Sequence, residues 1–278
     1  MGKNLEEKNI SLLLRLGRLS LILIALLFLI LFLFVPLVAV FAGAFEKGWD
    51  TYLKAITEPD VMASIKLTLL VALIVVPINV VFGLISSWLI TRFKFRGKGL
   101  LLTILEIPLA VSPVIAGMVF ILLYGSRGLF APLLEYLDLK IVFAFPGIVL
   151  ATIFVTMPYV ARELIPVMEE RGVSEEEASL SMGASGFRTF WSVTIPNIKW
   201  GLLYGIILCN ARAMGEFGAV SVVSGHIRGV TNTMPLQVEV LYNEYNFTSA
   251  FAVSSLLAML ALLTLILKSI FEWKCNEE

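Results

Sequence analysis

The sequence LSLILIALLFLILFLFVPLVAVFAGAF, residues 19–45, contains no charged side chain and is apolar almost throughout. About 20 such residues in a row suffice for a helix that crosses the hydrocarbon core of a membrane. The stretch follows Arg15 and Arg18, as a signal peptide would, but it is too long for an h-region. It therefore predicts a membrane-spanning helix that remains in the mature protein.

Five further stretches are long and apolar enough to repeat this pattern. They lie at about residues 64–91, 99–124, 141–162, 200–223 and 246–268. The whole chain agrees, because 59% of its residues are hydrophobic and 15% are charged, whereas a soluble domain carries about 25% charged residues. We expect the fold class to be an all-α polytopic membrane protein with six transmembrane helices.

The segments on one side of the predicted membrane carry most of the Lys and Arg side chains. They are Lys3, Lys8, Arg15, Arg18, Arg92, Lys94, Arg96, Lys98, Arg162, Arg171, Arg188, Lys199, Lys268 and Lys274. Cytoplasmic loops carry such an excess, and an even number of spans puts both termini on one side. We therefore expect a cytoplasmic amphipathic segment at 1–18, a transmembrane domain at 19–272 and a cytoplasmic tail at 273–278.

Composition excludes several kinds of site. The 21 basic and 21 acidic residues cancel, which predicts no nucleic-acid partner. Cys209, Cys275 and the single histidine, His226, cannot form a disulfide framework or a multi-histidine metal site, and we expect His226 in a solvated loop. No G-x-x-x-x-G-K-[ST] loop is present to bind ATP. We expect this chain to bind no metal and no cofactor.

Prolines lie in the second, third and fourth predicted spans. Pro77 lies in the second, Pro108 and Pro113 in the third, and Pro146 and Pro158 in the fourth. Proline removes a helical hydrogen bond, which membrane helices tolerate where neighbouring helices or water satisfy the freed carbonyl. We expect these spans to be broken there, either because they line a cavity or because they pack as ordinary kinked helices.

The long segment between the fourth and fifth spans has a pattern of its own, SEEEASLSMGASGFRTFWSVTIP, residues 174–196. Ser174 and Glu177 have the spacing of a capping box, and Gly183 or Gly186 can take the left-handed turn that ends a helix. Pro196 then marks the start of the fifth span. We expect two short helices on the cytoplasmic side, a compact unit suited to docking a soluble partner.

Part of this segment has a recognisable spacing. Its members are Glu177, Ala178, Ser179, Gly183, Val193, Ile195 and Pro196. This spacing resembles the E-A-A-x3-G-x9-I-x-L-P signature of permeases in bacterial ABC importers, with conservative replacements at Ser179, Val193 and Ile195. The resemblance implies a type I ABC importer permease fold in which this coupling segment docks to a separate ATPase subunit, where ATP and Mg²⁺ act.

The resemblance continues beyond the coupling segment. The stretches are IPLAVSPVIAG at 107–117, NARAMGEFGAVSVVSG at 210–225 and MPLQVE at 234–239. They are similar to W-type permeases of sulfate/thiosulfate importers, in the binding-protein-dependent transport inner-membrane component family. The core ARAMGE is shared with T-type and molybdate permeases, and the continuation FGAVSVVSG favours the W-type.

This resemblance implies a multi-pass protein of the bacterial inner membrane that forms half of a path for sulfate or thiosulfate. The implied partners are a sister T-type permease, two ATP-binding cassette subunits and a periplasmic sulfate-binding protein, which would contact the outer loop 224–246. The chain would be a transport subunit without an ATPase site of its own, and not an enzyme.

Three ionisable residues, Glu106, Arg212 and Glu216, lie away from the ends of predicted spans, where each needs a partner, water or a function. Arg212 and Glu216 are four residues apart on one helix face, and they form either a neutralising ion pair or part of the translocation path or its gate, with Arg212 binding a passing oxyanion. Pro108 and Pro113 join this candidate path. We expect Glu106 to accept hydrogen bonds from a neighbouring helix and not to meet the anion.

Three alternatives remain open. A molybdate or other oxyanion ABC permease shares the core of the fifth span. A gradient-driven secondary transporter would usually show internal repeats, and the sequence contains none that is convincing. A membrane enzyme would need paired carboxylates, a histidine cluster or a nucleophile motif at the membrane face, and none is found in the sequence.

Overall fold

The structure is a computed structural model that describes residues 17–275, so most of the expected segment 1–18 and residues 276–278 of the tail lie outside the described residues. Every regular element in the described part is a helix. The first helical segment is Gly17–Phe45, which contains η1 (Ile30–Phe34) and α2 (Val35–Phe45). The others are α3 (Trp49–Thr57), α4 (Pro59–Arg92), α5 (Lys98–Ala110), α6 (Pro113–Tyr124), α7 (Ala131–Tyr136), α8 (Phe145–Arg171), α9 (Ser174–Ser181), α10 (Gly186–Thr189), η2 (Phe190–Thr194), α11 (Ile195–Met214), α12 (Gly218–Ser224), α13 (Met234–Asn243) and α14 (Phe247–Cys275).

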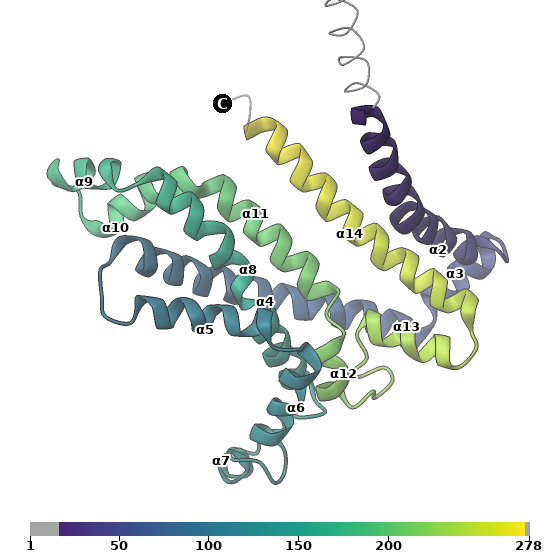
Figure 1. Cartoon of the computed structure of the whole chain (residues 1–278). Coiled ribbons are helices and arrows are strands. Elements are labelled where there is room, and N and C mark those ends of the chain that lie inside the picture. Colours follow the sequence, from purple (N-terminus) through teal and green to yellow (C-terminus); the bar gives the residue numbers. More distant parts are fainter. Residues whose placement is uncertain (1–16, 276–278) are drawn as a thin grey trace, which may run out of the picture.

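Three long helices, α4, α8 and α11, form the centre of the molecule (Figure 1). Helix α5 lies against α8, and α14 packs against α2, α11 and α13. Among the described residues, five helices are long and apolar enough to cross a membrane, or up to six if the bent pair α5 and α6 is one span. If α5 and α6 are counted as one span, the number of candidate spans is six, as the sequence predicts.

Glycines allow the central helices to approach closely. A Cβ atom added to Gly83 of α4 would lie 2.6 Å from the Cβ of Val160 on α8. One added to Gly205 of α11 would lie 3.2 Å from the Cα of the same valine. Small residues at such crossings are a common device of membrane helices, because lipid supplies no hydrophobic drive for helix association.

A buried polar contact also joins the three central helices. The Nδ2 of Asn79 on α4 donates to Thr156 Oγ1 on α8 at 2.7 Å and lies 3.7 Å from Cys209 Sγ on α11. All three side chains are fully buried. In apolar surroundings the amide must find its partner within the protein, so this contact helps to define how the helices face one another.

The prolines have unequal effects. Helix α4 continues through Pro77 and α8 continues through Pro158, while Pro146 lies in the first turn of α8. The expectation that these prolines break their spans is therefore wrong. Both helices are held along their length by close neighbours, which support the backbone where a hydrogen bond is missing.

The third span is broken where it was expected to be. Helices α5 and α6 meet at 106° across Val111 and Ser112, which both have extended backbone. Ser112 precedes Pro113, and a residue before proline disfavours the helical region. Pro108 removes one more hydrogen bond in the last turns of α5.

Two π-turns occur within residues 17–275, and each directly precedes a proline. In η1 the N–H of Val35 donates to the carbonyl of Ile30, one residue before Pro36. In η2 the N–H of Ile195 donates to the carbonyl of Phe190, one residue before Pro196. The wider turn accommodates a ring that has no N–H and would clash with the carbonyl four residues back, so the helix continues.

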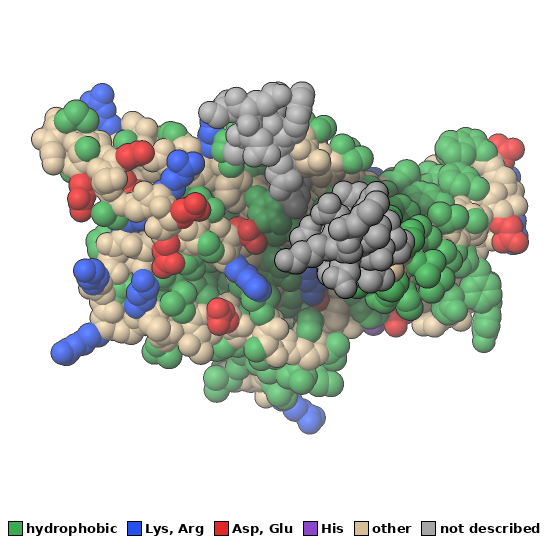
Figure 2. Space-filling view, turned by 45° about the horizontal axis from the view of Figure 1, so that its top comes forward, with side chains coloured by type: hydrophobic (Ala, Val, Ile, Leu, Met, Phe, Trp, Pro, Cys, Tyr) green, Lys and Arg blue, Asp and Glu red, His purple; other side chains and the backbone are tan. Residues whose placement is uncertain are grey.

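The two ends of the bundle differ in character. Helices α9 and α10 and the loop between α4 and α5 lie at one end, while α3 and α13 lie at the opposite end (Figure 1). Helices α6 and α7 project from the bundle (Figure 1). Charged side chains gather at the end that carries α9 and α10, and a largely hydrophobic surface adjoins it (Figure 2).

Candidate functional site

The coupling segment forms a helical hairpin at one end of the bundle. Helix α9 ends in a left-handed turn at Gly183, whose φ is +87°. The N–H of Ala184 donates to Ser179 and that of Gly183 donates to Leu180, the two bonds of a Schellman motif. Gly183, and not Gly186, therefore provides the predicted left-handed turn.

The start of α9 differs from the prediction. Its N-cap residue is Val173, and no side chain caps it, so Ser174 and Glu177 form no capping box. Ser174 is the first residue of the helix itself and therefore does not occupy the N-cap position. The N-terminal turn contains three glutamates, which complement the positive end of the helix dipole without a side-chain cap.

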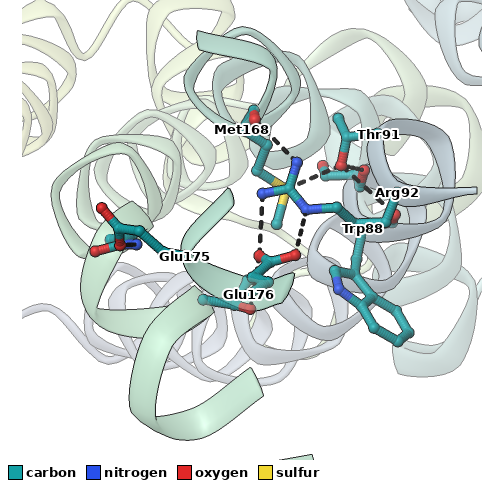
Figure 3. A network of polar contacts seen from close by, with 9 residues as sticks. Trp88, Thr91, Arg92, Met168, Glu175 and Glu176 are labelled. Carbon is teal, nitrogen blue, oxygen red and sulfur yellow. Dashed lines mark hydrogen bonds and ion pairs between the residues drawn. The ribbon is translucent and has the colours of Figure 1, made fainter. Parts of the chain in front are cut away.

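An ion pair anchors α9 to the long helices (Figure 3). The Nε of Arg92, at the end of α4, lies 2.7 Å from Glu176 Oε2, and its Nη2 donates to Glu176 Oε1 at 3.0 Å. The other guanidinium nitrogen donates to the carbonyl of Met168 on α8 at 3.0 Å. Thr194 Oγ1 also donates to Glu176 Oε1, at 2.8 Å. The Glu176 carboxylate thus links α9 to α4 and η2, and Arg92 extends the link to α8.

The neighbouring glutamates have different environments. Glu175 is exposed and accepts a hydrogen bond from Asn197. Glu177, the residue that matches the coupling signature, is also exposed. Because it lies on the surface of α9, it is free to meet another protein.

Ser179 occupies a position where the coupling signature has alanine, and its side chain is buried. Its hydroxyl lies 3.0 Å from the hydroxyl of Thr189 on α10, which is buried too. The added oxygen is therefore paired, and the pair closes the hairpin between α9 and α10.

The second expected short helix is not separate from the fifth span. Residues Gly186–Met214 form one continuous helical segment through α10, η2 and α11. The π-turn before Pro196 lets the helix continue, so Pro196 does not begin a new element. Val193 and Ile195 are half-buried on this segment, while Pro196 is exposed. Helices α10 and α11 are therefore continuous with each other.

An apolar surface covers the tip of the hairpin. Met182 is 83% exposed, Phe187 76% and Trp191 56%, and Leu180 is also exposed. Ala178 lies beside them on α9 and is exposed as well. Contiguous exposed apolar residues on a polar end of a protein are typical of a protein–protein contact.

A second feature of the site is a pair of helix breaks that lie together. Helix α11 ends at Met214, and α12 begins at Gly218. A Cβ added to Gly218 would lie 2.9 Å from the Cβ of Pro113, at the break between α5 and α6. One added to Gly117 of α6 would lie 2.8 Å from the carbonyl oxygen of Ala219. The distal halves of the third and fifth spans therefore pack in close contact.

Arg212 and Glu216 form an ion pair of 2.7 Å at this break. Glu216 lies beyond the end of α11 and is 1% exposed, so the expectation that both residues share a continuous helix face is wrong. Its Oε1 accepts the backbone N–H of Ala219 at 3.0 Å, in the first turn of α12. The carboxylate is held both by a cation and by a helix N-terminus.

The predicted path residues are partly brought together. Pro113 is close to Gly218 and is half-buried, whereas Pro108 is buried in α5. Glu106 is exposed, and among residues 17–275 it has no hydrogen-bond partner, so its expected role as an acceptor is not observed. Within the same residues, no group of three His, Cys, Asp or Glu side chains is placed to hold a metal ion.

Sequence patterns missed Glu176 and Gly218. The signal for Glu176 is weak, because three successive glutamates differ only in which face of a short helix they occupy. The signal for Gly218 is that small residues within membrane spans are common where two helices approach closely.

The sequence is similar to that of known proteins. The sequence matches the family "Binding-protein-dependent transport system inner membrane component" over residues 79–273. The sulfate transport system permease protein CysW of Escherichia coli (strain K12) is 52% identical over 88% of this chain and 84% of its own. CysT of Salmonella typhimurium is 34% identical over 87% of each chain.

A solved structure has the same fold. It is the crystal structure of a bacterial alginate ABC transporter in complex with its periplasmic protein, which is bound to an alginate pentasaccharide. One chain of it superimposes with a TM-score of 0.76 over 90% of this chain and 91% of that chain, at 15% identity. This likeness concerns the fold alone.

Proposed function

Since this chain belongs to the binding-protein-dependent transport system inner membrane component family, we propose that it is the membrane-spanning subunit of an ATP-driven sulfate importer. The observation that carries this proposal is its 52% identity to a CysW sulfate permease over most of both chains, against 34% to a CysT permease. The difference supports a W-type subunit that works beside a T-type sister.

In the proposed orientation, the end with α9 and α10 faces the cytoplasm of a bacterial inner membrane. The α4–α5 connection at this end carries four cations, Arg92, Lys94, Arg96 and Lys98. The positive-inside rule favours the cytoplasmic side for such a loop. The pair α5 and α6 counts as one broken span. Six spans result, and both termini share the cytoplasmic side.

The coupling segment is proposed to dock to the ATPase subunit, in which ATP and Mg²⁺ act. Glu177, Ala178 and Gly183 would contact that subunit through the exposed tip of the hairpin. Val193, Ile195 and Pro196 would carry the movement into α11, because α10 and α11 are one helical segment. The buried pair of Ser179 with Thr189 supports a hairpin that moves as a unit.

The translocation path is proposed to lie beside the paired helix breaks. Pro108, Pro113, Arg212 and Glu216 belong to the two broken spans, where backbone outside regular helix is tolerated only when it is buried or faces water. This chain would supply half of the path and a T-type subunit the other half. A periplasmic sulfate-binding protein would dock at the opposite end, near 224–246.

Replacement of CysW in Escherichia coli by this chain tests the proposal. We expect growth on sulfate as sole sulfur source and uptake of labelled sulfate, while cysteine supports growth with or without the gene. Competition by thiosulfate, selenate and molybdate ranks the anions. Uptake of labelled molybdate without uptake of sulfate would favour a molybdate permease instead.

Loss of uptake on collapse of the proton gradient at constant ATP would support a secondary transporter. Co-purification of an ATPase subunit in mild detergent separates the transport models further. A chain that reaches the membrane, retains the ATPase and moves no sulfate would contradict the proposal.

A further inference from the structure

Helix α8 carries an arginine well before its C-terminal end. Arg162 was expected at the end of the fourth span, but α8 continues to Arg171. At 1.5 Å per residue, Arg162 lies about 13 Å before that end. Its side chain is exposed, and among residues 17–275 it has no ion-pair or hydrogen-bond partner. Arg212, by contrast, is paired with Glu216.

A cavity of about 200 Å³ lies between α5 and α8 at this arginine. Its wall includes Leu105, Glu106, Leu109, Pro158, Arg162 and Pro166. A water molecule takes about 30 Å³ of the liquid, so the cavity has room for roughly six waters, or for one sulfate with part of its hydration shell. Apart from the negative Glu106 and the positive Arg162, the wall is apolar.

Exposed charges in a spanning helix are costly where they face lipid, so such residues usually face water or protein. Glu106 and Arg162 both belong to candidate spans and open into the same cavity. An unpaired guanidinium in a largely apolar cavity is a strong site for a tetrahedral oxyanion, because its planar fork donates two hydrogen bonds to two oxygens of one anion.

We propose that Arg162 binds the transported divalent oxyanion in the half of the path nearest α9, and that Glu106 keeps this binding weak. Transit requires a site that attracts the ion and also releases it. The carboxylate across the cavity repels a dianion and shortens its stay. This inference rests on the proposed function, because it takes an oxyanion as the substrate.

The test uses the complete importer in proteoliposomes, with this chain, its sister permease, ATPase and binding protein. The maximal rate of labelled sulfate uptake is measured beside ATP hydrolysis stimulated by the loaded binding protein. We expect Arg162→Gln to lower uptake about tenfold, the effect of one charge-assisted hydrogen-bond pair, with ATP hydrolysis retained. Arg162→Lys keeps the positive charge but loses the planar two-point donor, so its uptake rate should lie between those of the unmodified importer and Arg162→Gln.

A double variant separates anion binding from a structural ion pair with Glu106. If Arg162 binds the anion, uptake by Arg162→Gln combined with Glu106→Gln stays well below that of the unmodified importer, because removing the repelling carboxylate supplies no cation to bind the anion. Full recovery of uptake in the double variant would overturn the proposal, because a neutral pair would then suffice. The matched control is Arg127→Gln, an exposed arginine outside the helices, with uptake unchanged.

The outcomes also separate the two proposals. If the unmodified importer takes up sulfate and Arg162→Gln takes it up at the same rate, only the role of Arg162 is overturned. An unmodified, assembled importer that moves no tetrahedral oxyanion overturns both.

Discussion

Glu176 on α9 and Arg92 at the end of α4 form a two-point ion pair, with contacts of 2.7 and 3.0 Å. The side chains are 14% and 9% exposed, so water screens the pair little. Since Arg92 also holds the carbonyl of Met168, this pair fixes the hairpin to two of the three central helices. Such an anchor would let the proposed docking hairpin pass its movement to α4 and α8.

The first prediction concerns this anchor. We expect Glu176→Gln to weaken the attachment of α9 by about 1–3 kcal/mol, because Arg92 loses a charged acceptor. Hydrogen exchange at 174–181 should become faster by about tenfold or more, while the central helices keep their protection. Glu175→Gln is the control, because Glu175 is exposed and accepts its hydrogen bond from Asn197 and not from Arg92. Equal exchange in both variants would show that the ion pair does not hold α9.

Gly183 gives a second prediction. Its φ of +87° disfavours any side chain, yet nothing lies within 4 Å of an added Cβ. Gly183→Val should therefore cost about 1–2 kcal/mol through the backbone alone and reduce co-purification of the ATPase. Gly186→Ala is the control in the same segment. Gly186 has no positive φ and nothing lies within 4 Å of its added Cβ, so this variant should retain the ATPase. Normal coupling in Gly183→Val would reject a role for this turn.

The sequence predicts some of these features and not others, for physical reasons. Apolar length alone predicts the long helices, because lipid leaves the backbone no other partner. The coupling segment predicts a left-handed turn at Gly183 or Gly186. Whether a proline breaks a helix depends on tertiary neighbours, so Pro77 and Pro113 look alike in sequence and differ in the structure.

The orientation of short polar helices is also set by tertiary contacts. Nothing local distinguishes Glu176 from Glu177, because both lie in one helical turn. The distinction comes from Arg92 and Thr194, which are distant in sequence from α9. For the same reason, the contact between Pro113 and Gly218 is invisible to local patterns, although both residues belong to stretches that resemble sulfate permeases.

The packing at the paired breaks gives a third prediction. Gly218→Val would place side-chain carbon within 2.9 Å of Pro113 and force α6 and α12 apart. We expect lower thermal stability of the purified complex by about 1–3 kcal/mol and a large loss of sulfate uptake. Gly215→Ala is the control at the same break, because its added Cβ meets only the carbonyl of Ala211 at 3.4 Å. Unchanged uptake in Gly218→Val would remove the breaks from the path.

The last prediction separates the two roles left open for Arg212 and Glu216. Arg212→Gln leaves a buried carboxylate without its cation, which costs about 3–5 kcal/mol in comparable buried pairs. Glu216→Gln should cost less, because the amide oxygen can still accept the N–H of Ala219. The double variant removes the unpaired charge, and we expect its melting temperature to return most of the way to that of the unmodified complex.

Sulfate uptake by this stable double variant then decides between the roles. If Arg212 meets the anion in the path, uptake stays about tenfold lower although the complex is intact, because an amide cannot replace a charged two-point donor. If the pair only holds α11 to α12, uptake returns together with stability. We expect the first result, since Arg212 is about one-third exposed while Glu216 is 1% exposed. A buried structural pair would leave both charges inaccessible, whereas here the guanidinium keeps an open side at the break between two spans.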